Sequence, residues 1–322
     1  MNKVKAGVVG VGHMGQYHAV VYTELIDPNN LTLVDINEDR VKPISQRYGV
    51  PFHLDYRELF GKVDIVSIAV PTPLHYPIAR DFLENGIHVL LEKPIARDIK
   101  EAEALFALAE KNKLTLHIGH VERFNGAIQE LKKIVDNPYL IECRRLGPFA
   151  QRVQDDGVVL DLMIHDIDMV LNLVDSDVVE IHAMGATICS AKDDLANVQM
   201  LFKNGCIANI IASRVTQNKI RNLAISQKDS YIFLDYTDQD IHVHRCAASA
   251  HTLTKEELKY KQESFVERIF VHKENPLKSE LKHFIDCSTN GASRKVSVDR
   301  ELASLRHAIR IMELMKRHRA PS

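Results

Sequence analysis

Three glycines near the N-terminus constrain the fold of this chain more than any other feature. Gly10, Gly12 and Gly15 follow the apolar run Ala6–Val9 at the spacing G-x-G-x-x-G. This pattern predicts a buried parallel strand that turns tightly into a helix over residues 13–25. The first glycine permits the turn, the second leaves the backbone open to a pyrophosphate, and the third lets the helix pack closely on the strand.

A second apolar strand ends in Asp35, about 20 residues after Gly15. An acid at this place suits the hydroxyls of an adenosine ribose, so the unit predicts dinucleotide binding, with His13 and Met14 in the phosphate-facing turn. No arginine directly follows Asp35, which favours NAD, whereas Arg40 keeps NADP open as the alternative. A turn whose glycines serve packing alone is the other interpretation.

Length and composition bound the class of protein. A chain of 322 residues predicts about two domains, and 45% hydrophobic with 26% charged residues is ordinary for a soluble globular protein. A net charge of −2 does not indicate a nucleic-acid partner. The five cysteines are scattered without a C-x-x-C pair, so we expect a reducing cytoplasm, no disulfide framework and no structural zinc site. Neither a signal peptide nor a transmembrane helix is expected.

The order of the predicted elements divides the chain near residue 120. Strands and helices alternate up to Gly119, which is typical of a doubly wound parallel sheet, and residues 1–120 are predicted as an NAD-binding Rossmann domain of α/β class. Residues 121–322 are predicted as an α+β domain, because strands follow one another from Val178 to His244. We expect a helix over 158–174 before these strands.

Lys93 is the first candidate for chemistry. It follows the apolar strand His88–Leu91, and a dinucleotide fold places its reactive ring at the carboxyl ends of the strands. An ammonium group there stabilises negative charge that develops on a substrate oxygen. The bond to Pro94 is a candidate cis peptide. The alternative interpretation is a surface lysine.

Asp161 and His165 are the second candidates. They lie four residues apart and share one face of the predicted helix, with Asp168 a further turn along. A carboxylate that orients an imidazole and raises its basicity makes a general base for a hydroxyl proton. The alternative interpretation is a helix whose acids face solvent and whose histidine caps a neighbouring element. No metal site is predicted here, and His242 and His244 on one strand lack further ligands.

Four segments together resemble the glucose-fructose oxidoreductase / inositol dehydrogenase / MocA family over essentially the whole chain. They are Gly10–Gly15 with His18, His88–Pro94, Gly119–Asn125 and Asp161-x-x-x-His165. The resemblance implies an NAD-dependent oxidoreductase with a Rossmann domain and a large, mainly antiparallel, open-faced sheet domain. It further implies that the second domain binds the substrate and pairs its sheet faces in a homodimer or homotetramer.

The resemblance also implies the roles of individual residues. It places Lys93, Asp161 and His165 in the catalytic set, which also contacts the substrate. The other implied contacts are Thr72, His75 and Glu92 on the nicotinamide and ribose side, and Arg123 and Asn125 at the nicotinamide or substrate. The chain departs from the family pattern at Met163 and Gly126, where glycine and proline are common.

The implied substrate is a small sugar or nucleotide sugar. The segments around His165 and Arg123 look most like a branch that includes UDP-N-acetylglucosamine 3-dehydrogenases, which make a 3-keto nucleotide sugar for lipid A assembly. An inositol or free-sugar dehydrogenase is the first alternative. A dinucleotide-binding regulator without turnover is the second, although that interpretation predicts loss of the catalytic residues, and all three are present.

Overall fold

The computed structural model describes residues 3–149, 156–246 and 264–317, and the chain forms two compact units. The first unit comprises residues 1–124 and 274–310, and the second comprises residues 125–273 and 311–322. The expected second domain ran unbroken from 121 to 322, whereas residues 274–310 return to the first unit. The physical reason is apolar burial, because Leu277, Leu281 and Phe284 pack into the same core as the first strand and helix.

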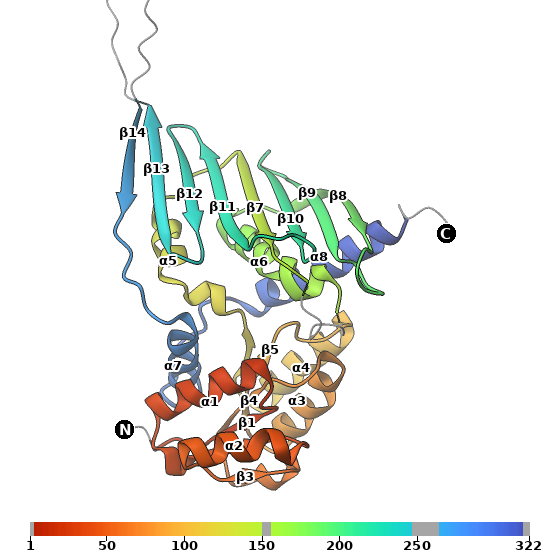
Figure 1. Ribbon diagram of the computed structural model, residues 1–322, viewed down its shortest axis with the longest axis vertical. Coiled ribbons are helices and arrows are strands. Elements are labelled where there is room, and N and C mark those ends of the chain that lie inside the picture. Colours follow the sequence, from red (N-terminus) through yellow and green to blue (C-terminus); the bar gives the residue numbers. More distant parts are fainter. Residues whose placement is uncertain (1–2, 150–155, 247–263, 318–322) are drawn as a thin grey trace, which may run out of the picture. The chain divides into compact units, whose positions relative to one another are not determined.

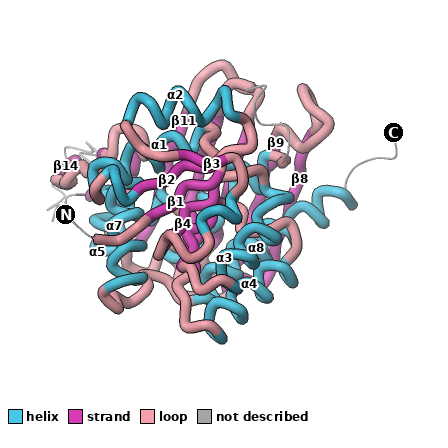
Figure 2. Tube along the Cα trace, turned by 90° about the horizontal axis from the view of Figure 1, so that it is seen from below, coloured by secondary structure: helices cyan, strands magenta, loops and turns pink. Residues whose placement is uncertain are grey.

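The first unit is a doubly wound parallel sheet, as the alternating pattern predicted. Its strands are β1 (Ala6–Val9), β2 (Leu31–Val34), β3 (Phe52–His53), β4 (Ile65–Ile68), β5 (His88–Glu92) and β6 (Leu116–Gly119), in the order β3-β2-β1-β4-β5-β6. Its helices are α1 (His13–Leu25), α2 (Glu38–Tyr48), α3 (His75–Glu84), α4 (Ile99–Lys111), α7 (Pro276–Thr289) and α8 (Val298–Arg317) up to Arg310. Figure 2 shows α1 and α2 on one side of the central strands and α3 and α4 on the other.

The second unit contains one eight-stranded sheet. Its helical elements are α5 (Gly126–Ile134), the π-helical turn η5 (Val159–Met163) and α6 (Ile164–Leu173). Its strands are β7 (Leu140–Leu146), β8 (Val178–Ala186), β9 (Leu195–Phe202), β10 (Ile207–Ser213), β11 (Ile220–Gln227), β12 (Ser230–Asp235), β13 (Asp240–Cys246) and β14 (Ser264–Ile269). The strand order is β14-β13-β12-β11-β7-β10-β9-β8 (Figure 1). All neighbouring pairs are antiparallel except β7 with β10, so the sheet is mainly antiparallel, as expected.

Two faces of this sheet differ in burial. A row that includes Ile141, Ala208 and Ile232 is fully buried. The helices α5 and α6 cover one face of the sheet (Figure 1). The next row includes Ile207 and Tyr231, which are 37% and 40% exposed. Because successive side chains of a strand point to opposite faces, one face of the sheet is open in the single chain.

The helix expected over 158–174 has an interruption that periodicity did not predict. Residues Val159–Met163 form a π-helical turn, and the regular α-helix α6 begins at Ile164. Such π turns are rare and occur often at functional sites. Among the described residues, no helix combines the length and apolar character that a membrane span requires.

Candidate active site

The glycine turn of the first unit meets the steric demands that its spacing predicted. Gly10 has a φ of +85°, and a Cβ atom there would lie 2.7 Å from the carbonyl oxygen of Ala69. A Cβ on Gly15 would overlap the carbonyl oxygen of Gly10, so α1 approaches the turn too closely for any side chain. Gly12 instead faces open space, because a Cβ there would have no atom within 4 Å. This cradle, followed by His13 at the start of α1, fits a pyrophosphate.

Asp35 lies at the end of β2 beside this turn. Its carboxylate is 5% exposed, and its Oδ2 atom accepts a hydrogen bond of 2.9 Å from the backbone N–H of Val11. Its Oδ1 atom accepts from the N–H of Asn37 at 2.9 Å. The half-exposed guanidinium of Arg40 donates to Oδ2 at 3.4 Å. The acid is therefore held rigidly at the edge of the cradle.

Glu92 and Lys93 form the turn at the end of β5. The buried carboxylate of Glu92 lies 3.0 Å from Nε2 of the fully buried His18 and accepts at 3.3 Å from the N–H of Lys93. Burial acts to raise the pKa of Glu92, but the His18 hydrogen bond and the charges of His18, Lys93 and His75 outweigh it and lower this pKa. Lys93 is half-buried, and its bond to Pro94 is cis, as the sequence suggested.

His75 and Thr72 lie at the end of the neighbouring strand β4. Both are buried, Thr72 in the 3-10 turn η3 (Thr72–Leu74) and His75 at the start of α3. His75 contacts the carbonyl oxygens of Pro94 and Val70 through Nδ1 and Nε2, at 2.8 and 2.9 Å. The imidazole thus ties the Lys93-Pro94 turn to β4, which places Thr72, Glu92 and Lys93 at one edge of the sheet.

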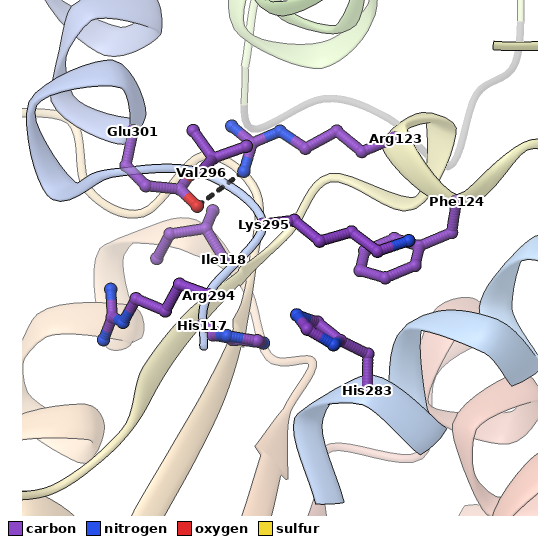
Figure 3. A pocket seen from close by; sticks show the side chains of 9 residues that line it. All are labelled: His117, Ile118, Arg123, Phe124, His283, Arg294, Lys295, Val296 and Glu301. Atoms are coloured by element: carbon purple, nitrogen blue, oxygen red, sulfur yellow. Dashed lines mark hydrogen bonds and ion pairs between the residues drawn. The ribbon is translucent and has the colours of Figure 1, made fainter. Parts of the chain in front are cut away.

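Arg123 is buried in an ion pair. It is 6% exposed in the 3-10 turn η4 (Val121–Phe124), and its Nη1 atom donates to Oε1 of Glu301 (Figure 3). Glu280 from α7 is also buried, and its burial, together with the charge of Glu92, raises its pKa well above the usual value despite the opposing charge of Arg123. The predicted contact of Arg123 with nicotinamide or substrate stays a prediction.

The other predicted site residues belong to the second unit. Asp161 lies in the π turn and His165 in the first turn of α6, and both are half-buried. Asp168, one turn on, is fully buried. Asn125 caps α5, because its Oδ1 atom accepts from the N–H of Ala127 at 3.0 Å. The predicted contact of Asn125 with nicotinamide or substrate also stays a prediction.

A buried ion pair holds the helix that carries His165. Arg145 on β7 donates from Nε and Nη2 to the two carboxylate oxygens of Asp166, at 2.8 and 2.9 Å. The guanidinium also lies over the ring of Tyr236, 5.2 Å from its centroid. A bidentate pair of this kind fixes orientation as well as distance. The residue that follows His165 in the chain is thus anchored to the sheet.

Several of these residues were not predicted. His18 was named only as part of the first segment that resembles the family, Glu280 was not singled out, and Arg145 lies in a strand that the sequence pattern did not reveal. Gly119 also has a role, since a Cβ there would lie 3.0 Å from the carboxylate of Glu92. The sequence signal that could have indicated His18 is the Glu92-Lys93-Pro94 turn, because an acid buried at a strand end needs a hydrogen-bond partner.

The cradle, the acid at the end of β2 and the polar residues at the strand ends define a dinucleotide-binding protein. Residues 4–120 match an oxidoreductase family with an NAD-binding Rossmann fold, and residues 123–229 match the GFO/IDH/MocA C-terminal domain. The chain therefore belongs to the GFO/IDH/MocA family of NAD-binding oxidoreductases.

Named relatives include dehydrogenases of two substrate classes. The chain is 34% identical to UDP-N-acetylglucosamine 3-dehydrogenase of Acidithiobacillus ferrooxidans over 249 residues, which are 77% of this chain and 79% of the relative. It is 27% identical to myo-inositol 2-dehydrogenase of Thermotoga maritima over 66% of this chain and 69% of that one.

Solved structures give a consistent result. A structure of the Acidithiobacillus ferrooxidans enzyme superposes with a TM-score of 0.88 at 29% identity, covering 98% of this chain and 99% of the other. A levoglucosan dehydrogenase in complex with NADH and levoglucosan superposes with a TM-score of 0.81 at 18% identity, covering 98% and 97%. The second likeness shows the fold alone.

Proposed function

We propose that this protein is an NAD-dependent dehydrogenase that oxidises the 3-hydroxyl of UDP-N-acetylglucosamine to a ketone. The observation that carries the proposal is the likeness to the Acidithiobacillus ferrooxidans enzyme, which extends over 77% of the chain in sequence and 98% in structure. A place in lipid A assembly in the cytoplasm is an expectation that rests on this substrate.

The proposed chemistry assigns one task to each catalytic residue. His165 takes the proton of the substrate hydroxyl, and Asp161 orients its imidazole and favours the charged form. The ammonium of Lys93 stabilises the negative charge on the oxygen that loses the proton. NAD, when bound, supplies the acceptor for the hydride that leaves the carbinol carbon. The proton goes from His165 to solvent after turnover.

The held carboxylate of Asp35 supports NAD over NADP. A 2′-phosphate beside this buried acid would place two negative charges together, whereas a free ribose hydroxyl donates to it. Arg40, whose guanidinium donates to Asp35 at 3.4 Å, is the cation that would reduce this preference for NAD over NADP. We expect Asp35→Ala to weaken NAD binding and to reduce the preference for NAD, measured by titration of both cofactors. An unchanged preference would contradict the role of Asp35.

A product assay separates the proposed substrate from its main alternative. The purified protein is incubated with NAD and either UDP-N-acetylglucosamine or myo-inositol, and the products are analysed by mass spectrometry. We expect only the nucleotide sugar to lose two hydrogens, with NMR locating the ketone at C3. Oxidation of myo-inositol alone would instead favour the class of the Thermotoga maritima relative.

The open face of the large sheet supports a homo-oligomer. Its exposed apolar residues include Ile207, Tyr231 and Val266, which lie in one row across the sheet, and exposed apolar side chains gathered on one face mark an interaction surface. We propose that two copies pair through this face in a dimer or tetramer. Light scattering after size-exclusion chromatography tests this, because Ile207→Lys together with Tyr231→Glu is expected to yield monomers. A wild-type protein that is monomeric at all concentrations would refute the proposal.

A further inference from the structure

Two histidines and a cysteine from distant parts of the sequence meet at the edge of the first unit. His117 lies on the edge strand β6, whereas His283 and Cys287 lie on α7. One donor atom from each of the three side chains lies within 4.8 Å of the other two. The two imidazole rings stack with their centroids 5.3 Å apart, and Figure 3 shows them side by side. None of these residues has a role in the proposed dehydrogenase chemistry.

The surroundings of the two imidazoles favour the neutral ring, which is the form that binds metal. Burial, together with the charges of Arg294 and His283, lowers the pKa of His117 to about 3. Burial and Lys295 lower the pKa of His283 as well. Both shifts favour the neutral ring, which offers a nitrogen lone pair. His117 is 8% exposed, and no described residue forms a hydrogen bond with its ring.

The end of α7 presents its two donors in a favourable way. His283 and Cys287 are four residues apart, so they share one face of the helix. Cys287 lies in the last turn of the helix, where the partial negative charge of the helix C-terminus favours a cation. The sulfur of Cys287 already contacts Nε2 of His283 at 3.5 Å. Thr115, which directly precedes β6, donates to the carbonyl oxygen of Cys287 at 3.5 Å and so links the strand to the end of the helix.

Two neighbouring cations oppose a metal ion but do not occupy the cluster. Arg294 lies over the ring of Phe106 and Lys295 over the ring of Phe124, at 5.5 and 4.4 Å from the centroids. Figure 3 shows the guanidinium of Arg294 directed away from His283. The charge of Asp286 acts in the opposite sense on His283. A thiolate ligand would further reduce the net charge of the bound ion.

We propose that His117, His283 and Cys287 bind one zinc-class ion that joins β6 to α7, with water as the fourth ligand. Two imidazoles and a thiolate match the nitrogen and sulfur ligands that Zn²⁺ prefers in tetrahedral sites. Burial raises the pKa of the Cys287 thiol, so binding displaces its proton to solvent. The ion would bridge segments that are 166 residues apart (283 − 117), which stabilises the folded chain through mass action.

Cobalt titration of the metal-free, full-length protein tests the site without an activity assay. We expect one Co²⁺ per chain to produce a thiolate-to-metal charge-transfer band, and one equivalent of Zn²⁺ to remove it and raise the melting temperature. Cys287→Ser should abolish the band and weaken Zn²⁺ binding by roughly 100-fold. The matched control is Cys189→Ser, which removes an exposed cysteine outside the cluster and should change neither signal.

The positive charge of Lys295 provides a second test, in which the substitution is expected to strengthen Zn²⁺ binding. Lys295→Gln removes a cation whose charge acts on His283, so we expect Zn²⁺ to bind a few-fold more tightly than in the wild type. Absence of a stoichiometric cobalt band in the wild-type protein would overturn the proposal, and so would a band that survives in Cys287→Ser. Weaker binding in Lys295→Gln would contradict the assigned position of the ion.

Discussion

The buried pair between Arg145 and Asp166 gives the sharpest test of how the second unit positions His165. The substitution Asp166→Asn keeps the size of the side chain and removes its charge. Both partners are almost completely buried, with 3% and 1% of their side chains exposed, and two hydrogen bonds of 2.8 and 2.9 Å join them. A buried guanidinium that loses its counterion in this way costs about 3–5 kcal/mol.

We expect Asp166→Asn to lower the free energy of unfolding by about 3 kcal/mol, the lower end of that range, because Tyr236 still contacts the guanidinium. Urea denaturation followed by far-UV circular dichroism measures this change, since the chain has no tryptophan for fluorescence. We also expect kcat to fall more than KM rises, because the anchor of the His165 helix is lost while the groups proposed to contact the substrate remain.

A second carboxylate in the same unit provides the matched control. Asp240 accepts a hydrogen bond of 2.7 Å from Arg268, but this pair lies at the surface. We expect Asp240→Asn to change stability far less than Asp166→Asn, because water screens an exposed pair. The reasoning is refuted if Asp166→Asn unfolds at the wild-type urea concentration, or if both substitutions cost the same.

Two further predictions concern the first glycines and the thiols. Gly12→Ala should leave the melting temperature unchanged and weaken NAD binding, because its Cβ enters the open cradle, whereas Gly15→Ala should also destabilise the fold by overlapping Gly10. Calorimetry measures the melting temperatures, and cofactor titration measures NAD binding. Equal behaviour of the two variants would contradict this prediction. Burial raises the pKa of Cys206 to about 11, so this thiol should remain protonated and unmodified by iodoacetamide at about pH 8.5, while the exposed Cys189 reacts. Mass spectrometry of the labelled peptides measures this difference, and rapid labelling of Cys206 in the folded protein would count against its burial.

Local patterns predicted the part of the fold that local forces determine. The turn at Gly10 and the helix that begins at His13 follow from steric demands within one short segment, and the structure has both at the predicted positions. The alternation of apolar strands and helices likewise predicted the parallel sheet. Asp35 was identified for the same reason, because its distance from the glycines is set by one strand-helix-strand unit.

Long-range packing determined what local patterns missed. β7 carries Arg145 among its buried residues, and a charged residue at an inward position hides the apolar alternation of a strand. The return of α7 to the first unit depends on the core that Leu281 and Phe284 join, which no local pattern reveals. The π turn at Asp161 is similarly invisible, because it shares the composition of an ordinary helix.

The same difference between local patterns and long-range packing applies to the candidate sites. Lys93 and His165 were identified because motifs of a few residues carry them, whereas the partners of Glu92 and Asp166 come from other strands and helices. The sequence predicted that the cysteines form no metal site. A successful cobalt titration of the cluster of His117, His283 and Cys287 would contradict that prediction. Spacing along the chain could not reveal it, because the donors come from segments far apart in sequence.

The measurement that tests the central claim most directly is the rate of NADH formation from NAD and UDP-N-acetylglucosamine. A carbonyl trap is included, because alcohol oxidation by NAD is otherwise limited by its equilibrium. The account predicts steady NADH formation by the wild-type protein and loss of most turnover in His165→Ala and Lys93→Ala, with NAD binding intact in both. Near-normal turnover in either variant, or no turnover by a wild-type protein that binds NAD, would contradict it.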